Sequence, residues 1–495
     1  MKRKDTLKVS RREFMKQAAA MCVGAFFYNS SSGIQISNFS DSGKKPLNVL
    51  FLFSDEHNPY FSSPYGHPFV QTPNMAKIAE RGVVFEAGYC PSPLCGPSRA
   101  AFFTGLHCHQ VPSYSNGSIF DGSLPTWSEL LTKQGIHTVH VGKTDVWPDV
   151  KLPYSEILLR RDRKRPGDIN FRRRPLAVRE GEIKRMDGYG VRLDPFAGDN
   201  RIFELAEDWL RKRANRIGKP WVLTVHFVCP HFPHYVTQDL WDMYADHADD
   251  LPKYDGSRSW EKHPYKLDLI KHFDLENVTE KQIRNMRRGY FGKVTYIDRM
   301  IGRVLSALEE SGQADNTIVI YTSDHGEMLG EHGLWWKCSM DEHSVRVPLI
   351  MSGPGIPAGI RVKTPVSTLD AQATFFEATG SRKPDHWVGN SLREILNDPS
   401  LVNSRVVFSE YHGHGVRSGA FMVRKGAWKM VYNMAAPNEL YNLIEDPDET
   451  KNLAESNAEK FSELEAELRR ICDPEEENEL TFMRQGARLK ELGLM

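Results

Sequence analysis

Carboxylates, imidazoles and a lysine directly follow four apolar runs of this sequence. In an open α/β sheet, ligands bind beyond the carboxyl ends of the strands. Polar residues at one strand end are common, but four such groups together predict a binding site at that edge of a sheet. The groups are Asp55-Glu56-His57, Gly142-Lys143-Thr144-Asp145, Cys229-Pro230-His231 and Ser323-Asp324-His325-Gly326-Glu327.

Three carboxylates in these groups, Asp55, Glu56 and Asp324, offer oxygen ligands to a divalent cation. No cluster of soft ligands accompanies them, which favours calcium or magnesium over zinc. The alternative role for Asp55 and Asp324 is capping of helix N-termini. Their joint occurrence favours the metal site.

Cys95 stands at a predicted helix start. Pro97 fits the first helical turn, and Gly105 is suited to end the helix. The helix dipole stabilises negative charge at that position. Two alternatives are a thiolate nucleophile, which lacks a neighbouring histidine in the sequence, and a buried structural cysteine.

The elements that would position these residues alternate between strand and helix. Apolar runs without alternation, typical of strands buried on both faces, cover residues 48–53, 138–141, 221–227 and 317–321. Amphipathic helical stretches cover residues 199–214 and 280–310. This order predicts an α/β fold with a large, mainly parallel sheet sandwiched by helices.

Short strand-like pieces replace this pattern from about residue 385. They cover residues 405–410, 419–424 and 428–433 and precede a charged helical segment over 454–471. We therefore predict a catalytic domain over residues 46–384, a smaller C-terminal α+β subdomain with an antiparallel sheet over 385–472, and a tail over 473–495.

The N-terminus is predicted to be an export signal. Ser10-Arg11-Arg12-Glu13-Phe14-Met15-Lys16 is a twin-arginine signature, and the apolar stretch over 18–28 is too short to span a bilayer. The alternative is a basic start before an amphipathic helix. We predict that residues 1–42 are a leader read by the twin-arginine export machinery. The mature protein would be periplasmic, with the outer surface or secretion as alternatives.

Composition excludes several classes of protein. The 64 basic and 64 acidic residues balance, so no nucleic-acid partner is implied. Seven cysteines in 495 residues are too few for a disulfide scaffold. Residues 160–192, the basic insertion, hold 12 Lys and Arg against 5 Asp and Glu. This segment is either a solvated surface excursion or a basic wall that attracts an anionic polymer.

The segment around Cys95 resembles a family signature. Cys95-x-Pro97-Ser98-Arg99-x-x-x-x-Thr104-Gly105 is similar to the signature of type I sulfatases, members of the alkaline phosphatase superfamily whose cysteine is oxidised to formylglycine. The resemblance runs from residue 48 to about 471 and includes Gly142-Lys143, Pro230-His231 and Trp336-Lys337. It implies an alkaline-phosphatase-like fold. It also implies a formylglycine-generating or sulfatase-maturing enzyme that converts Cys95 to 3-oxoalanine.

Two branches of the family share further segments with this chain. Glu331-His332-Gly333-Leu334-Trp335-Trp336-Lys337 resembles the choline-sulfatase and phosphonate-hydrolase branch. Ser409-Glu410-Tyr411-His412-Gly413 is similar to glucuronate-2-sulfatase, arylsulfatase K. The spacing between Lys143 and the later motifs agrees better with this second branch.

The resemblance implies a role for each motif residue. Lys143 and Lys337 would bind sulfate oxygens, Arg99 would hold the formylglycine, and His231 would protonate the departing sugar oxygen. One calcium ion per chain would be held by Asp55, Glu56, Asp324, His325 and the modified Cys95.

Two positions depart from the family pattern. Many members carry Asp or Gln where this chain has Glu56, which still offers an oxygen ligand. Many have a histidine where this chain has Asp145. Asp145 is therefore the candidate base for sulfate release, with a histidine from elsewhere as the alternative.

The sequence also offers candidates for sugar binding. His412 and Trp336 are the main ones, and His107, His109 and His414 have side chains of similar chemistry. We predict a sulfatase that acts on a sulfated oligo- or polysaccharide containing uronic acid, such as ulvan or glycosaminoglycan fragments. The alternatives are a phosphodiesterase or phosphonate monoester hydrolase of the same superfamily, and an unmodified protein that binds sulfated glycans.

Overall fold

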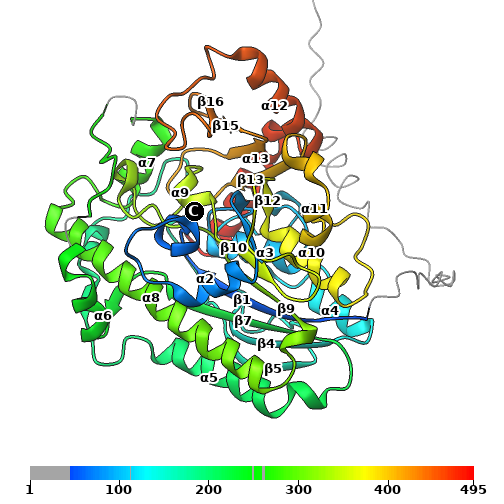
Figure 1. Cartoon of the computed structure of the whole chain (residues 1–495). Coiled ribbons are helices and arrows are strands. Elements are labelled where there is room, and N and C mark those ends of the chain that lie inside the picture. The colour runs from blue at the N-terminus through cyan, green and yellow to red at the C-terminus, as the bar shows by residue number, and fades with distance from the viewer. Residues whose placement is uncertain (1–44, 112, 248–249, 259–261) are drawn as a thin grey trace, which may run out of the picture. The chain divides into compact units, whose positions relative to one another are not determined.

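A computed structural model describes residues 45–111, 113–247, 250–258 and 262–495. The predicted leader over residues 1–42, with its twin-arginine signature, lies outside the described residues. Residues 46–495 form one compact unit (Figure 1). Within the described ranges, no helix has the length and apolar character needed to cross a membrane.

An eight-stranded sheet forms the centre of this unit (Figure 1). Its strand order is β11-β2-β10-β9-β1-β7-β4-β5. The five strands from β9 to β5 run parallel, whereas β10 runs antiparallel to β9 and β2. The strand bounds are β1 Asn48–Asp55, β2 Gly82–Phe85, β4 His137–Lys143, β5 Glu156–Arg161, β7 Trp221–Pro230, β9 Thr317–Ser323, β10 Leu349–Ser352 and β11 Ile360–Val362.

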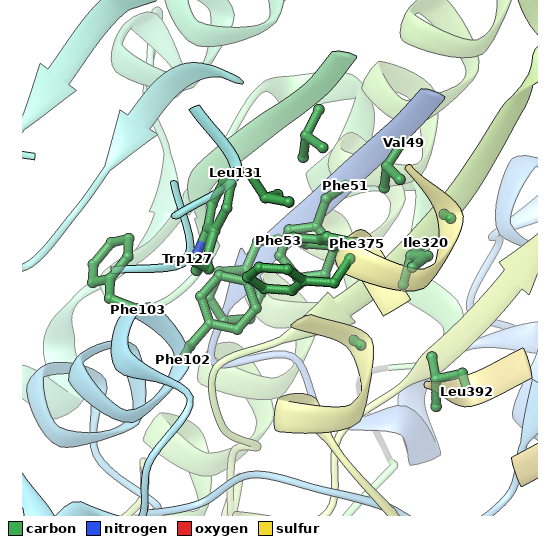
Figure 2. Packing of buried hydrophobic residues seen from close by; sticks show 14 of the residues in the cluster. Val49, Phe51, Phe53, Phe102, Phe103, Trp127, Leu131, Ile320, Phe375 and Leu392 are labelled. Atoms are coloured by element: carbon green, nitrogen blue, oxygen red, sulfur yellow. The ribbon is translucent and has the colours of Figure 1, made fainter. Parts of the chain in front are cut away.

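Helices cover both faces of the sheet, which explains why β1 is apolar from Val49 to Phe53. Successive side chains of a strand point to opposite faces. Phe51 and Phe53 pack in one core with residues of α3, α4 and α10 (Figure 2), and Leu50 and Leu52 pack in another with residues of α2, α5 and α8. The helix bounds are α2 Pro73–Glu80, α3 Cys95–Thr104, α4 Trp127–Lys133, α5 Ala197–Lys212, α8 Glu280–Glu310 and α10 Thr368–Ala378.

Aromatic packing fixes α3 against the central strand. The Phe102 ring on α3 stacks on Phe51 with their centroids 5.0 Å apart, and Phe375 on α10 meets Phe51 edge-on at 5.1 Å (Figure 2). Burying each such ring contributes roughly 1.5–3 kcal/mol. This packing sets the place of the helix that begins at Cys95.

A second, four-stranded antiparallel sheet forms the C-terminal part of the chain. Helix α12, Ala458–Ile471, packs on it through Leu464 and Leu468, which contact Phe421 and Val423 in a small separate core. The predicted fold class, with a main sheet and a smaller C-terminal subdomain, is confirmed; the domain boundaries stay predictions. The strands are β13 Val406–Tyr411, β14 Ala420–Lys425, β15 Trp428–Asn433 and β16 Glu439–Asn442.

The segment predicted as a tail contains helix α13, Pro474–Glu491, which braces the basic insertion. Gln485 Nε2 donates a hydrogen bond to the Phe171 carbonyl (2.7 Å), and Arg488 Nη2 donates to the Pro166 carbonyl (3.3 Å). The guanidinium groups of Arg173 and Arg174 lie 4.1 and 3.7 Å from the centroid of the Phe482 ring. The last helix of the chain therefore supports a segment some 300 residues earlier.

The remaining elements are short. The basic insertion contains a 3₁₀ helix, η4, over Glu182–Asp187, and β6, which pairs in parallel with β8. The other bounds are β3 Gly88–Tyr89, β6 Tyr189–Val191, β8 His234–Val236, β12 Val366–Ser367, α6 Gln238–Met243, α7 Pro264–His272, α9 Glu342–Val345 and α11 Leu392–Leu396.

Candidate active site

The parallel strands deliver polar residues to one edge of the sheet. Ser54 of β1 pairs with Ser323 at the end of β9, and Asp55 pairs with Pro230 at the end of β7. Lys143 is the last residue of β4, which lies beside β7. This register brings the first residues after each strand, and Asp55 itself, into one region.

Three of these residues and Cys95 lie close enough together to share one ion. Asp55, Cys95, Asp324 and His325 are buried, and each offers one ligand atom within 4.8 Å of the others. His325 Nε2 lies 3.6 Å from both Asp55 Oδ1 and Asp324 Oδ1. Because buried like charges repel, a cation among these oxygens would relieve the repulsion between the carboxylates. Their oxygen ligands fit a hard divalent cation.

His325 is oriented for this role by its backbone contact. Its Nδ1 lies 2.9 Å from the Gly326 carbonyl, which can only accept, so we assign the proton to Nδ1. Nε2 then keeps its lone pair directed at the cluster. Hydrogen bonding of the second ring nitrogen is the usual way in which a protein fixes a ligating histidine.

Glu56 lies beside this cluster, and both oxygens of its buried carboxylate lack a hydrogen-bond donor among the described residues. Its Oε1 lies 2.9 Å from Lys337 Nζ, but neither carboxylate oxygen accepts a hydrogen bond of normal geometry. Burial raises the pKa of Glu56 to about 8, despite the opposing effect of Lys337. Glu56 forms a second buried ligand group with Asp55 and His231. A buried carboxylate so poorly compensated fits a site that receives a cation.

Cys95 is the first residue of α3 and points its thiol at the cluster. Its Sγ lies 3.1 Å from His325 Nε2 and 3.7 Å from Asp55 Oδ1. Burial and the neighbouring Asp55 charge raise the pKa of the thiol to about 12. An unmodified Cys95 would therefore be protonated, which disfavours the thiolate alternative. Gly105 ends the helix at φ 67°, in the left-handed conformation that the sequence indicates.

Arg99 connects α3 to the strand ends. Its Nε donates to Asp324 Oδ2 (2.8 Å), and its Nη1 donates to the Lys143 carbonyl (3.1 Å). The guanidinium also lies 4.8 Å from the centroid of the Phe53 ring. Arg99 thus fixes Asp324, whereas the resemblance implies a contact with residue 95.

Lys143 lies between two carboxylates. Its Nζ pairs with Asp55 Oδ2 and lies 3.1 Å from Asp145 Oδ2. Asp145 is also held by Arg163, whose Nη2 lies 3.0 Å from Oδ1. Burial alone would raise the pKa of Asp145, but Arg163 and Lys143 lower it below its ordinary value. An aspartate held by two cations is a weak base. This geometry favours a positioning role toward Lys143, and the role of Asp145 as the base for sulfate release stays a prediction.

His231 contacts Lys337 beside Glu56. Its Nδ1 donates to the Phe232 carbonyl (2.6 Å), so Nε2 accepts from Lys337 Nζ at 2.9 Å. Burial, then the Lys337 charge, holds the pKa of His231 well below its ordinary value. The loop that carries His231 is held by Lys293 of α8, whose Nζ donates to the His231 and Pro233 carbonyls.

A cavity of about 660 Å³ adjoins this cluster at Lys143, which pairs with Asp55. Lys143, Asp145, His231 and Lys337 line it, and so does the substrate candidate Trp336. The basic insertion forms one wall through Arg161, Arg163, Lys164, Arg179 and Arg185, among others. Of the two interpretations of the basic insertion, the basic wall therefore fits its position at the cavity better than a solvated surface excursion does.

His412 does not line this cavity. Its Nε2 lies 2.8 Å from Glu410 Oε2, and its side chain is buried. His414, two residues later, lines the cavity instead and lies 3.0 Å from Asp168. The loop that carries His412, which sequence similarity indicated, reaches the cavity. Its conformation turns His414 rather than His412 toward the cavity. His109 is likewise turned away, with its Nδ1 2.9 Å from Glu410 Oε1.

Three residues of the site escaped sequence reasoning individually. Arg163 and Arg185 were noted only as part of the basic insertion, and Lys293 lies within a long amphipathic helix. Lys293 carries a weak signal, because a buried lysine on an apolar helix face requires an acceptor. Identifying that acceptor requires the fold.

Protein families and individual proteins with similar sequences or structures were found. The family model described as Sulfatase matches residues 47–381, and the model described as N-sulphoglucosamine sulphohydrolase, C-terminal, matches residues 330–476. A choline-sulfatase of Rhizobium meliloti is 31% identical over 430 residues, covering 83% of this chain and 82% of that protein. Arylsulfatase K of Bos taurus is 31% identical, covering 86% and 82%. Both branches indicated by the sequence motifs thus recur among these relatives.

Solved structures show the same fold. A protein in complex with its substrate D-glucosamine-2-N,6-O-disulfate has a TM-score of 0.68 at 24% identity, covering 86% of this chain and 97% of that chain. A phosphonate monoester hydrolase of Agrobacterium radiobacter has a TM-score of 0.68 at 23% identity, covering 86% and 95%. At these identities the likeness extends to the fold alone.

Proposed function

The chain belongs to the sulfatase family, and from this membership we propose that it removes sulfate from a saccharide that contains uronic acid. The protein is a sulfuric ester hydrolase. Ulvan and glycosaminoglycan fragments are the proposed sources of the saccharide. The observation that carries the proposal is the cavity, in which a buried cluster of metal-ligating groups adjoins a wall rich in arginine and lysine.

We further propose that Cys95 is converted to formylglycine by a maturing enzyme and that one calcium ion binds beside it. Asp55, Glu56, Asp324 and His325 would hold the ion together with the modified residue, and their burial and oxygen-rich chemistry support this assignment. When present, the two groups supply the nucleophile and neutralise charge on the sulfate.

Lys143 and Lys337 act on the sulfate oxygens. Both ammonium groups are nearly buried, and they pair with different carboxylates of the site, Lys143 with Asp55 and Lys337 with Glu56. Fixed cations in a site that excludes water stabilise developing negative charge without reorganisation. Asp145 and Arg163 keep Lys143 in place, and Glu56 does the same for Lys337.

His231 is placed to handle the proton of the departing oxygen. His231 lines the cavity, and its Nε2 receives a hydrogen bond from Lys337. The ring is neutral in this environment because burial lowers its pKa. A bound sulfate ester brings negative charge next to the ring, which favours the imidazolium that can donate a proton.

Asp145→Asn tests the positioning role. We expect kcat/KM to fall about 10- to 100-fold, because Lys143 loses one of its two ion-pair partners. Asp162→Asn is the control, since Asp162 lines the same cavity but pairs with Arg160. Intact-protein mass spectrometry during turnover is the second measurement. Accumulation of a covalently sulfated enzyme in Asp145→Asn would instead show that Asp145 is the base for sulfate release.

A second candidate reaction is cleavage of phosphodiesters or phosphonate monoesters. It is favoured by the fold likeness to a phosphonate monoester hydrolase. Charge does not separate the candidates, because a sulfate monoester, a phosphodiester and a phosphonate monoester each carry one negative charge. Rates with an aryl sulfate, an aryl phosphodiester and an aryl phosphonate separate them. We expect the highest kcat/KM for the sulfate, and faster cleavage of either phosphorus ester would overturn the proposal.

Export is proposed as well. The twin-arginine signature in the leader supports translocation of the folded protein to the periplasm, with the outer surface or secretion as alternatives. Twin-arginine export would allow Cys95 to be modified before translocation. Cell fractionation with Arg11→Lys/Arg12→Lys as the control variant tests this. Unchanged export of the double variant would contradict it.

A further inference from the structure

We propose that Arg185 binds a second anionic group of the substrate, a carboxylate or a second sulfate, and thereby selects doubly charged saccharides. This inference rests on the proposed function and adds a specificity-determining residue to it. Arg185 belongs to η4 of the basic insertion and lines the cavity that adjoins the metal-ligating cluster.

Arg185 lies within reach of a substrate whose sulfate contacts Lys337. The Arg185 guanidinium lies 5.2 Å from the centroid of the Phe232 ring and 5.5 Å from that of Trp336. Lys337 Nζ also lies 5.2 Å from the Phe232 centroid. The two cations are therefore separated by at most twice that distance. Anionic substituents on one sugar, or on neighbouring sugars, can span such a gap while the scissile sulfate contacts Lys337.

The side chains that line the cavity carry a net positive charge. Seven Lys and Arg side chains line the cavity against three Asp side chains, which leaves an excess of positive charge for more than one anion. Each aspartate is already paired: Asp145 with Arg163 and Lys143, Asp162 with Arg160, and Asp168 with Arg179 and His414. The acidic groups of the cavity therefore do not neutralise Arg185.

Arg185 has N–H donors available for a ligand. In the described part of the chain, Glu182 is the sole hydrogen-bonding or ion-pair partner found for the Arg185 side chain. A guanidinium has five N–H donors, so most of them remain for a ligand. The Arg185 side chain is 32% exposed, whereas Arg179 is 8% exposed and is held by His272 and Asp168. Arg185 is therefore better able to meet a substrate.

The rings of Phe232 and Trp336 also preorganise Arg185. They lie beside the guanidinium and cover part of it, which strengthens its electrostatic interactions while the side chain stays 32% exposed. A planar guanidinium matches the two oxygens of a carboxylate or sulfate with paired hydrogen bonds. The aromatic neighbours thus hold Arg185 in a form suited to an oxyanion.

The test compares Arg185→Gln and Arg185→Lys with Lys184→Gln, which removes an adjacent exposed charge outside the cavity. One pair of sulfated disaccharides differs only in a free carboxylate or its methyl ester, and a second pair differs only in a second sulfate. A simple aryl sulfate reports the basal reaction. Each disaccharide is assayed for sulfate release and as an inhibitor of aryl sulfate hydrolysis.

We expect wild-type protein to prefer the doubly charged member of one pair about 10- to 100-fold, through KM or the inhibition constant. Preference within the first pair assigns a carboxylate, and within the second pair a sulfate. Arg185→Gln should lose this preference and keep aryl sulfate turnover within about twofold. Arg185→Lys should recover part of it, and Lys184→Gln should behave as wild type.

Equal treatment of both members of both pairs by wild-type protein, or retention of the preference in Arg185→Gln, overturns the inference. Failure of the proposed function looks different. In that case aryl sulfate is hydrolysed and no disaccharide releases sulfate, while the inhibition constants still report whether Arg185 recognises the second anion.

Discussion

Cys95→Ala is expected to lower aryl sulfatase activity by about 10⁴-fold or more, because the substitution removes the proposed precursor of the nucleophile and losses of this size follow removal of a nucleophile. The fold should persist. Cys95 lies on α3, whose place is fixed by Phe102 packing on Phe51 rather than by the thiol. Steady-state kinetics and thermal unfolding of the same preparation measure both effects.

Cys108→Ala is the matched control for this variant. Cys108 is also buried, but its Sγ faces the carbonyls of Pro91 and Pro97 and is not part of the ligand cluster. It should keep nearly full activity. In wild-type protein, the tryptic peptide containing Cys95 should be about 18 Da lighter than the thiol form, as conversion to the aldehyde requires. Full activity in Cys95→Ala, or an active preparation with an intact thiol at Cys95, would contradict the proposed chemistry.

Removal of the divalent cation is expected to produce the second large effect. Dialysis against EGTA should reduce activity at least about 100-fold, because the charge that a metal neutralises in the transition state is worth several kcal/mol. The thermal midpoint should also fall. Asp55, Asp324 and Glu56 would then be buried together without the cation that offsets their charge.

Calcium should restore both quantities, and magnesium should restore them less well. A site built from several carboxylates and a histidine suits calcium, which accepts many ligands in flexible geometry, whereas magnesium retains waters and demands an octahedron. Arg99→Gln offers a structural comparison, since it frees Asp324 without removing a ligand. Full activity after exhaustive chelation, in protein that elemental analysis shows to be free of metal, would refute the assignment.

Much of the fold was accessible from local sequence patterns. The uninterrupted apolar run before Asp55 predicts a strand buried on both faces, and β1 is covered by helices on each side. The helix predicted over 280–310 matches α8, because a capping box at Thr279 and a long amphipathic pattern mark it. The antiparallel β10 was not predicted. It spans four residues, too few to show a distinctive period.

The site was partly accessible for a different reason. Residues at the ends of parallel strands must meet at one edge, so the sequence alone suffices to group Asp55, Lys143 and Asp324. Asp145 is predicted to be a base because it stands where many family members have a histidine. Its ion pair with Arg163 could not be predicted, because Arg163 comes from a separate segment. The choice between His412 and His414 depends on one loop conformation, which no local pattern encodes.

The contact between α13 and the basic insertion has a consequence for how specificity can change in this protein. The basic insertion is held by Gln485 and Arg488 of α13, which donate hydrogen bonds to its Phe171 and Pro166 carbonyls. If the basic insertion were replaced by one with another sequence, the new segment would therefore lack matching contacts with α13. Exchange of substrate preference between homologues should succeed when the basic insertion and α13 are transferred together. Selectivity would then depend on two segments that lie far apart in the sequence and vary together.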